Sequence, residues 1–92
     1  MTEKSKIEKI RDELESIEMK CYIRCGEDVK CIIQNQVTSE HYIESTFQKL
    51  LDFYENEMFM EWFWKLIAYI EPFNFVLAGF YRRLERTLRE GN

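Results

Sequence analysis

The sequence predicts a mainly α-helical protein: a compact bundle of about four helices in a single domain, residues 1–92, with a short β-hairpin after the first helix. Three observations predict this. Apolar residues recur at helical spacing in several long segments. Three glycines and one proline leave little room for long loops. The composition, 46% hydrophobic and 15% aromatic, is ample for a core.

The first helix is expected from about Thr2 to Lys20. Its apolar residues are spaced 3, 4, 3 and 4 apart, which gives a narrow stripe on a charged helix: Ile7, Ile10, Leu14, Ile17 and Cys21. Two heptads are too few to define a coiled coil. They suit a helix that lies along a bundle or pairs with its own copy.

Residues 21–33 favour a β-hairpin, because β-branched and aromatic residues flank a three-residue turn at Gly26-Glu27-Asp28. In that register one face would carry Cys21, Ile23, Cys25, Val29, Cys31 and Ile33. The alternative extends the first helix to Cys25 and uses Gly26 as the residue after its C-cap. A two-stranded hairpin is marginal alone, so helices would have to pack behind it.

The second helix is expected to start at an N-cap, Thr38, and to end near Glu55-Asn56. Its apolar face follows the helical period: Ile43, Phe47, Leu50, Leu51 and Tyr54.

The third helix, expected over residues 57–71, is unusually rich in aromatic residues. Glu57, Glu61 and Lys65 form its one polar stripe, so the apolar side covers roughly 200° of the helix, against the usual stripe of somewhat over 100°. Trp62 and Trp64 lie about 160° apart at 100° per residue. One monomeric core is therefore not expected to cover both.

The last helix is expected to begin at Pro72, which is permitted in a first turn, and to stop at Gly91. Its expected buried face consists of Phe73, Val76, Leu77, Phe80, Leu84 and Leu88. Gly79 would allow another helix to cross closely.

The net charge of −4 argues against general nucleic-acid binding. Residues 1–71 hold nine basic and fifteen acidic residues, or −6, whereas residues 72–92 hold four arginines and two glutamates, or +2. The charged start gives no signal peptide, and charged residues interrupt the apolar stretch 58–80, so no membrane span and a cytoplasmic location are expected. In the cytoplasm, the three cysteines are expected to be reduced.

A metal or redox site would have to use Cys21, Cys25 and Cys31, together with the only histidine, His41. On a strand, Cys21 and Cys25 would lie about 13 Å apart, too far to share an ion, whereas on a helix they would be one turn apart. We expect three small buried hydrophobic residues, no metal and no cofactor.

The sequence contains no nucleophile motif and no glycine-rich phosphate loop, so no enzymatic activity and no catalytic residue is expected. The many glutamates, including Glu40 and Glu44, are expected on solvated faces.

These observations predict a small non-catalytic protein–protein interaction module, regulatory, adaptor or inhibitor in kind, that acts as a homodimer through its aromatic-rich helix. The partner would be another protein or a second copy of the chain. The expected partner-binding residues are Phe59, Trp62, Phe63, Trp64, Tyr69, Arg82, Arg86 and Arg89. Two alternatives remain: a metal-stabilised or redox cysteine module, and binding of nucleic acid or an acidic partner by the C-terminal arginine stripe.

Overall fold

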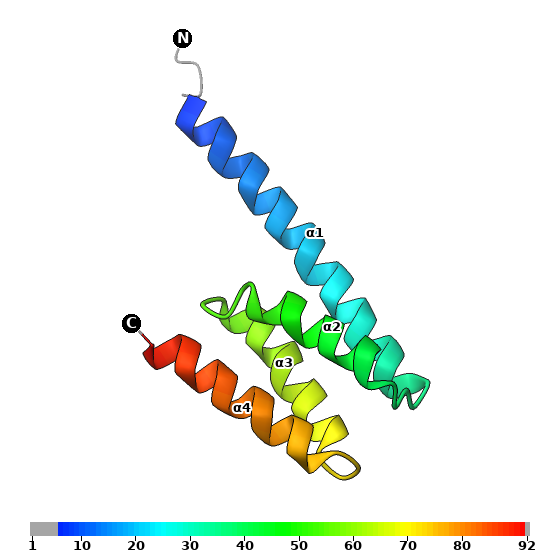
Figure 1. Cartoon of the computed structure of the whole chain (residues 1–92). Coiled ribbons are helices and arrows are strands. Elements are labelled where there is room, and N and C mark those ends of the chain that lie inside the picture. The colour runs from blue at the N-terminus through cyan, green and yellow to red at the C-terminus, as the bar shows by residue number, and fades with distance from the viewer. Residues whose placement is uncertain (1–5, 92) are drawn as a thin grey trace.

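The computed structural model describes the backbone of residues 6–91 and the side chains of residues 15–91. This part of the chain forms four helices: α1 (Lys6–Gln34), α2 (Glu40–Leu51), α3 (Glu57–Ile70) and α4 (Phe75–Glu90). Consecutive helices run in opposite directions, and α3 contacts each of the other three (Figure 1). The prediction of a mainly helical bundle of about four helices is confirmed.

The predicted β-hairpin over residues 21–33 is wrong, since the whole segment lies within α1 and the described residues include no strand. The alternative, a helix that ends at Cys25 with Gly26 after its C-cap, is also wrong, because α1 continues to Gln34. Cys25, Val29 and Ile32 are buried at i, i+4 and i+7, which is the helical period. Burial against α2 and α3 therefore outweighs the β-propensity of this segment.

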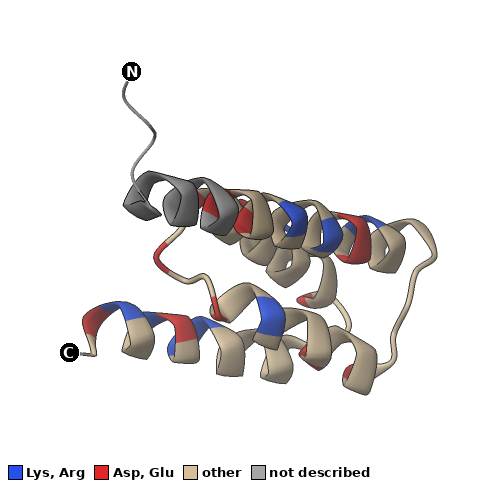
Figure 2. Cartoon of the chain, turned by 90° about the horizontal axis from the view of Figure 1, so that it is seen from above, with Lys and Arg blue, Asp and Glu red and all other residues tan. Residues whose placement is uncertain are grey.

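Helix α1 is about twice as long as the other helices, with 29 residues against 12 to 16. At about 1.5 Å per residue it is roughly 44 Å long, and its N-terminal half extends beyond the other three helices (Figure 1). Seen from above, α1 and α4 lie on opposite sides of the bundle (Figure 2). The side chains of Ile7, Ile10 and Leu14, part of the predicted apolar stripe, lie outside the described residues, as do residues 1–5 altogether.

Helix α1 ends in a Schellman motif whose left-handed residue is not a glycine. The Val37 amide donates to the Ile32 carbonyl at 3.0 Å, and the Gln36 amide donates to the Ile33 carbonyl at 3.3 Å. Gln36 has a φ of 52°, and glycine is the residue usually found at this position.

Gln36→Gly is expected to stabilise the protein by about 1 kcal/mol, because the left-handed conformation costs a residue with a Cβ about that much. The change in free energy of unfolding should be read from urea denaturation. Gln34→Gly, placed inside the last turn of α1, is the matched control and should destabilise by about 0.5–1 kcal/mol. A destabilising Gln36→Gly would contradict the strain argument.

Helix α2 begins one residue later than predicted and ends earlier. Its N-cap is Ser39, whose hydroxyl accepts from the Tyr42 amide, and not Thr38. Residues 52–55 form a turn instead of extending the helix to Asn56. Asn56 caps α3 by accepting from the Met58 amide at 2.9 Å, and its side-chain amide donates to Glu18 of α1 at 2.8 Å. This one side chain therefore begins α3 and ties the α2–α3 turn to α1.

The core is aromatic at its centre, where Phe47 of α2 lies between α3 and α4. Phe47 stacks on Tyr81 with ring centroids 4.3 Å apart and meets the edge of Phe63 at 5.3 Å. The Tyr81 hydroxyl donates to Glu44 at 3.2 Å, and burial, followed by the negative charge of Glu44, raises the pKa of Tyr81 to about 12. Tyr81 therefore stays protonated and holds α4 against α2.

Helix α4 presents a different face to the bundle from the one predicted. Its inward side chains are Leu77, Ala78, Tyr81, Leu84, Glu85 and Leu88. Phe73, Val76 and Phe80, predicted to be buried, are exposed. Pro72 lies in the preceding turn, and Asn74 caps the helix by accepting from the Leu77 amide at 3.2 Å. The sequence carries two apolar stripes on this helix, and only one of them faces the core.

In the part of the chain that the structure describes, no helix combines the length and the apolarity needed to cross a membrane.

Candidate interaction surfaces

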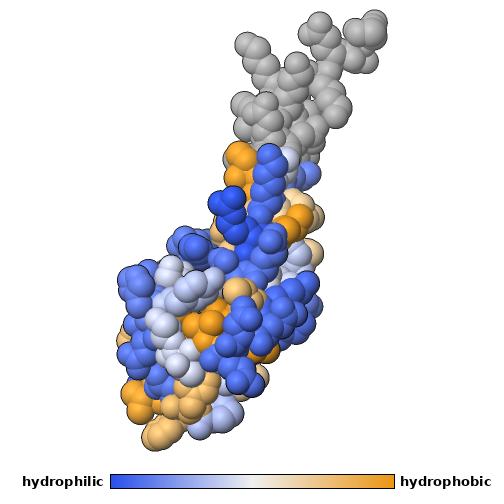
Figure 3. All heavy atoms as spheres, turned by 90° about the vertical axis from the view of Figure 1, so that its right-hand side faces the viewer, coloured by the Kyte–Doolittle hydropathy of each residue, from blue (hydrophilic) through white to orange (hydrophobic). Residues whose placement is uncertain are grey.

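Four large apolar side chains gather at the start of α4 and in the turn before it, and we call them the α4 patch. Their exposed fractions are 45% for Phe73, 74% for Phe75, 67% for Val76 and 47% for Phe80. Figure 3 shows hydrophobic surface at the end of the molecule opposite the N-terminus, where Figure 1 places the α3–α4 turn. Val76 and Phe80 line one shallow depression, and exposed large apolar side chains gathered at one place are typical of interaction sites.

Gly79 lies on the outward side of α4, one turn after Phe75 and Val76 and one turn before Arg82 and Arg83. A Cβ added to Gly79 would meet no atom within 4 Å. The helix backbone is therefore open to close approach beside the patch, one turn beyond Phe75 and Val76.

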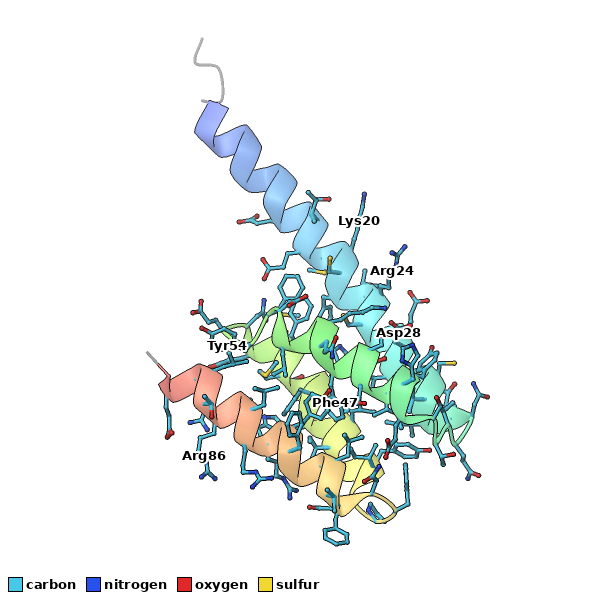
Figure 4. The ribbon with its side chains drawn as sticks, viewed as in Figure 1. Lys20, Arg24, Asp28, Phe47, Tyr54 and Arg86 are labelled. Atoms are coloured by element: carbon cyan, nitrogen blue, oxygen red, sulfur yellow. The ribbon has the colours of Figure 1, made fainter. Side chains whose placement is uncertain are left out.

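Charged residues of opposite sign border the two ends of the α4 patch. At the N-terminal end, Glu40 accepts from the Asn74 side-chain amide at 2.8 Å, and Glu40 and Glu44 line a shallow depression with Val76 and Phe80. Towards the C-terminal end the outer surface of α4 carries exposed arginines: Arg82, Arg83 and Arg86. Arg86 points away from the bundle (Figure 4).

A second feature is a groove between the N-terminal half of α3 and the C-terminal half of α4, with a volume of about 750 Å³. We call it the α3–α4 groove. The α2–α3 turn closes one end, where Tyr54 lies near the C-terminal end of α4 (Figure 4). Met60, Trp64 and Leu88 give it apolar walls, and Glu55, Glu57 and Glu61 are exposed along it.

The predicted partner-binding residues of the aromatic helix mostly contribute to the core. Phe59 and Phe63 are 1% and 0% exposed, so neither reaches an accessible surface of the folded chain. Tyr69 is half-buried, and its hydroxyl donates to the Val37 carbonyl at 2.8 Å, which holds the α1–α2 turn against α3. The wide apolar side of α3 is thus largely covered by the other three helices.

The two tryptophans have different surroundings. Trp62 packs on α1 at Gly26, where an added Cβ would lie 2.8 Å from two ring atoms, and Lys30 and Lys65 lie 5.5 and 4.8 Å from its ring centroid. Its indole nitrogen is buried without a hydrogen-bond acceptor among the described residues. Trp64 is 42% exposed and lines the α3–α4 groove.

The predicted arginines do not form one free stripe. Arg82 is paired with Glu71, and Arg89 donates to Glu85 through Nε at 3.1 Å and Nη2 at 3.4 Å. Arg86 is exposed, and no described acidic group lies within ion-pair distance of it. Arg82 and Arg89 are therefore held by acidic residues of the chain, whereas Arg86 has no such partner among the described residues.

The cysteines do not converge, although residues 21–33 are helical. Cys25 is buried, Cys31 is exposed, and Cys21 is half-buried. Burial, followed by the charge of Asp28, raises the pKa of the Cys25 thiol, so this thiol stays protonated at neutral pH. No group of three or more His, Cys, Asp or Glu residues within the described residues is placed to hold a metal ion.

Sequence reasoning missed both surfaces. Three members of the α4 patch, Phe73, Val76 and Phe80, were recognisable as apolar but were assigned to the core. Ala78 and Tyr81, at helical spacing with Leu77 and Leu84, were the signal that another stripe of α4 faces inward. The groove had no local signal, because its residues come from three separate segments.

Comparison with known proteins adds no relative: no protein-family model, no curated protein and no solved structure matches this chain.

Proposed function

We propose that the chain is a non-catalytic protein–protein interaction module that works as a homodimer, with the α4 patch as its dimer surface. The observation that carries this proposal is the exposure of four large apolar side chains within residues 73–80, with Phe75 at 74% and Val76 at 67%. Packing them against a second copy would remove most of this apolar surface from water, at about 25 cal/mol for each Å² buried.

Charge complementarity favours a second copy as the occupant, packed with the two α4 helices antiparallel. A two-fold interface uses the same surface on both subunits, so that surface has to be complementary to itself. With the crossing at Gly79, Arg83 of one copy lies at the level of Phe75 in the other, four residues or about 6 Å from the centre. That places it near Glu40, which is held at this end of α4 through Asn74. Because the dimer is two-fold symmetric, the contact between Arg83 of one copy and Glu40 of the other would form twice.

The open backbone at Gly79 is the second support for the pairing. A helix interior with alanine is about 1 kcal/mol more stable than one with glycine, and nothing in the monomer fills the space of a Cβ here. Gly79 thus brings no packing benefit to the monomer, whereas it lets two helices approach each other closely. One face of a 16-residue helix offers a small interface, so we expect a dissociation constant on the order of micromolar.

Sedimentation equilibrium over a concentration series tests the proposal. Wild-type protein should pass from monomer to dimer, and Val76→Arg and Gly79→Leu should stay monomeric. Ala68→Arg makes a comparable change on the exposed stripe of α3 and is the matched control; it should dimerise like wild type. Circular dichroism melting should show that the variants are folded.

A wild-type protein that remains monomeric at roughly 1 mM, where even weak specific contacts are populated, would overturn the dimer. Dimerisation of Val76→Arg with wild-type affinity would overturn the choice of the α4 patch.

A further inference from the structure

We propose that the α3–α4 groove is a docking site for an arginine-containing segment of a partner protein, with an apolar residue next to the arginine. This inference deepens the proposed function by giving the chemistry of a partner, and rests on it only in treating the chain as an interaction module. The groove faces the α3 side of α4 and so is separate from the α4 patch.

The size and walls of the groove suit a peptide side chain with its neighbours. Its volume, about 750 Å³, lies in the range of about 300–1,000 Å³ that is common for binding sites. Apolar side chains from both helices line it, with Met60 and Trp64 from α3 and Leu88 from α4. An apolar residue of the partner would be covered there.

The charge of the groove selects a cation. Four glutamates and one arginine line it, which is −4 and +1, or a formal charge of −3. Among the side chains that the structure describes, no cation lies within ion-pair distance of Glu55, Glu57 or Glu61. Carboxylates repel phosphate, so a nucleic acid is disfavoured at this surface.

The exposed ring of Trp64 is the second observation that points to a cation. The ring of Trp62 is approached by two lysines, at 4.8 and 5.5 Å from its centroid, whereas no described cation lies over Trp64. A guanidinium is attracted to the face of an indole ring, and arginine is the cation most often found there. The ring and the neighbouring Glu61, on the same helix, are therefore positioned to bind one arginine together.

The chain itself places a guanidinium beside this groove. Glu85, only 4% exposed, accepts from Arg89 through both of its oxygens. Two parallel hydrogen bonds of this kind are the geometry in which carboxylates recognise arginine more specifically than lysine. Three further carboxylates line the groove, and none of them is paired with a cation in the described part of the chain: Glu55, Glu57 and Glu61.

Isothermal titration tests the inference with a capped six-residue peptide of alternating arginine and leucine as the probe. The wild-type chain should bind it and change its tryptophan fluorescence. Glu57→Gln combined with Glu61→Gln should weaken binding by about 10-fold, because two exposed charge pairs with the peptide are lost. Trp64→Phe should remove most of the fluorescence change.

Two controls separate docking from general attraction. Glu15→Gln combined with Glu27→Gln makes the same charge change on exposed positions of α1 and should alter affinity less than about 2-fold. A peptide of alternating glutamate and leucine should not bind. Docking in the groove would be contradicted if the two α1 substitutions weaken peptide binding as much as those at Glu57 and Glu61, or if neutralising Glu57 and Glu61 leaves the affinity unchanged.

The Val76→Arg variant keeps this test independent of the dimer. It should bind the arginine peptide with wild-type affinity as a monomer, because Val76 does not line the groove. If the monomer binds the peptide, docking in the groove is supported even where wild-type protein does not dimerise. If the protein dimerises but does not bind the peptide, docking in the groove is wrong and the dimer proposal stands.

Discussion

Phe47→Ala is expected to lower the free energy of unfolding by about 3–5 kcal/mol, the range for truncating a fully buried phenylalanine. Phe47 is 0% exposed and touches the rings of Tyr81 and Phe63, so its loss leaves a cavity shared by α2, α3 and α4. A chain of 92 residues has about 5–14 kcal/mol of stability in all. The variant should therefore lose a large share of its stability.

Urea denaturation followed by circular dichroism measures this loss. Phe75→Ala is the matched control, since the same atoms are removed from a side chain that is 74% exposed. At a concentration where the chain is monomeric, the control should change stability by less than about 0.5 kcal/mol. Equal losses in the two variants would contradict the placement of Phe47 at the centre of the core.

Gly26→Ala is expected to destabilise the protein by about 1–3 kcal/mol, because its Cβ would overlap the Trp62 ring. Two ring atoms lie 2.8 Å from the position of that Cβ, and a whole indole would have to move. The same substitution in a Trp62→Ala background should have the opposite sign. There the space is open, and alanine stabilises a helix interior by about 1 kcal/mol over glycine.

The measurement is a double-mutant cycle in urea, with an expected coupling of about 2–4 kcal/mol between the two positions. Gly79→Ala, for which the added Cβ meets nothing, controls for the gain in helix propensity alone. Additive effects of Gly26→Ala and Trp62→Ala would show that the helix and the indole are not in contact.

The sequence was most informative where one apolar stripe repeats at the helical period. The face of α2, with Ile43, Phe47 and Leu50, was predicted and is buried. The segment 21–33 failed because its apolar residues fit two periods. Cys21, Ile23 and Cys25 alternate as in a strand, whereas Cys25, Val29 and Ile32 follow a helix. The partners that favour the helix, Phe59 and Trp62, contact Tyr22 and Gly26 from more than 30 residues further along the chain.

The same limit applies to the surfaces. Helix α4 carries apolar residues on two sides, and only the position of α2 and α3 determines that Leu77 and Leu84 face inward while Phe80 faces outward. The groove requires Glu55, Trp64 and Leu88 to meet from three elements. No local sequence pattern predicts that these three residues lie close together. The positions of Trp62 and Trp64 on opposite sides of the helix predicted that one core would not cover both, but not which of the two remains exposed.

The two sides of α4 give the proposed assembly a definite valency. The apolar outer surface lies in the N-terminal half of this helix, whereas the acidic groove adjoins its C-terminal half. Pairing two copies in opposite directions would leave a groove at each far end of the paired helices. Such a dimer would hold two arginine segments of one target at once, and avidity could raise its effective affinity by 10²–10⁴-fold over a single weak site, as is typical of linked binding sites.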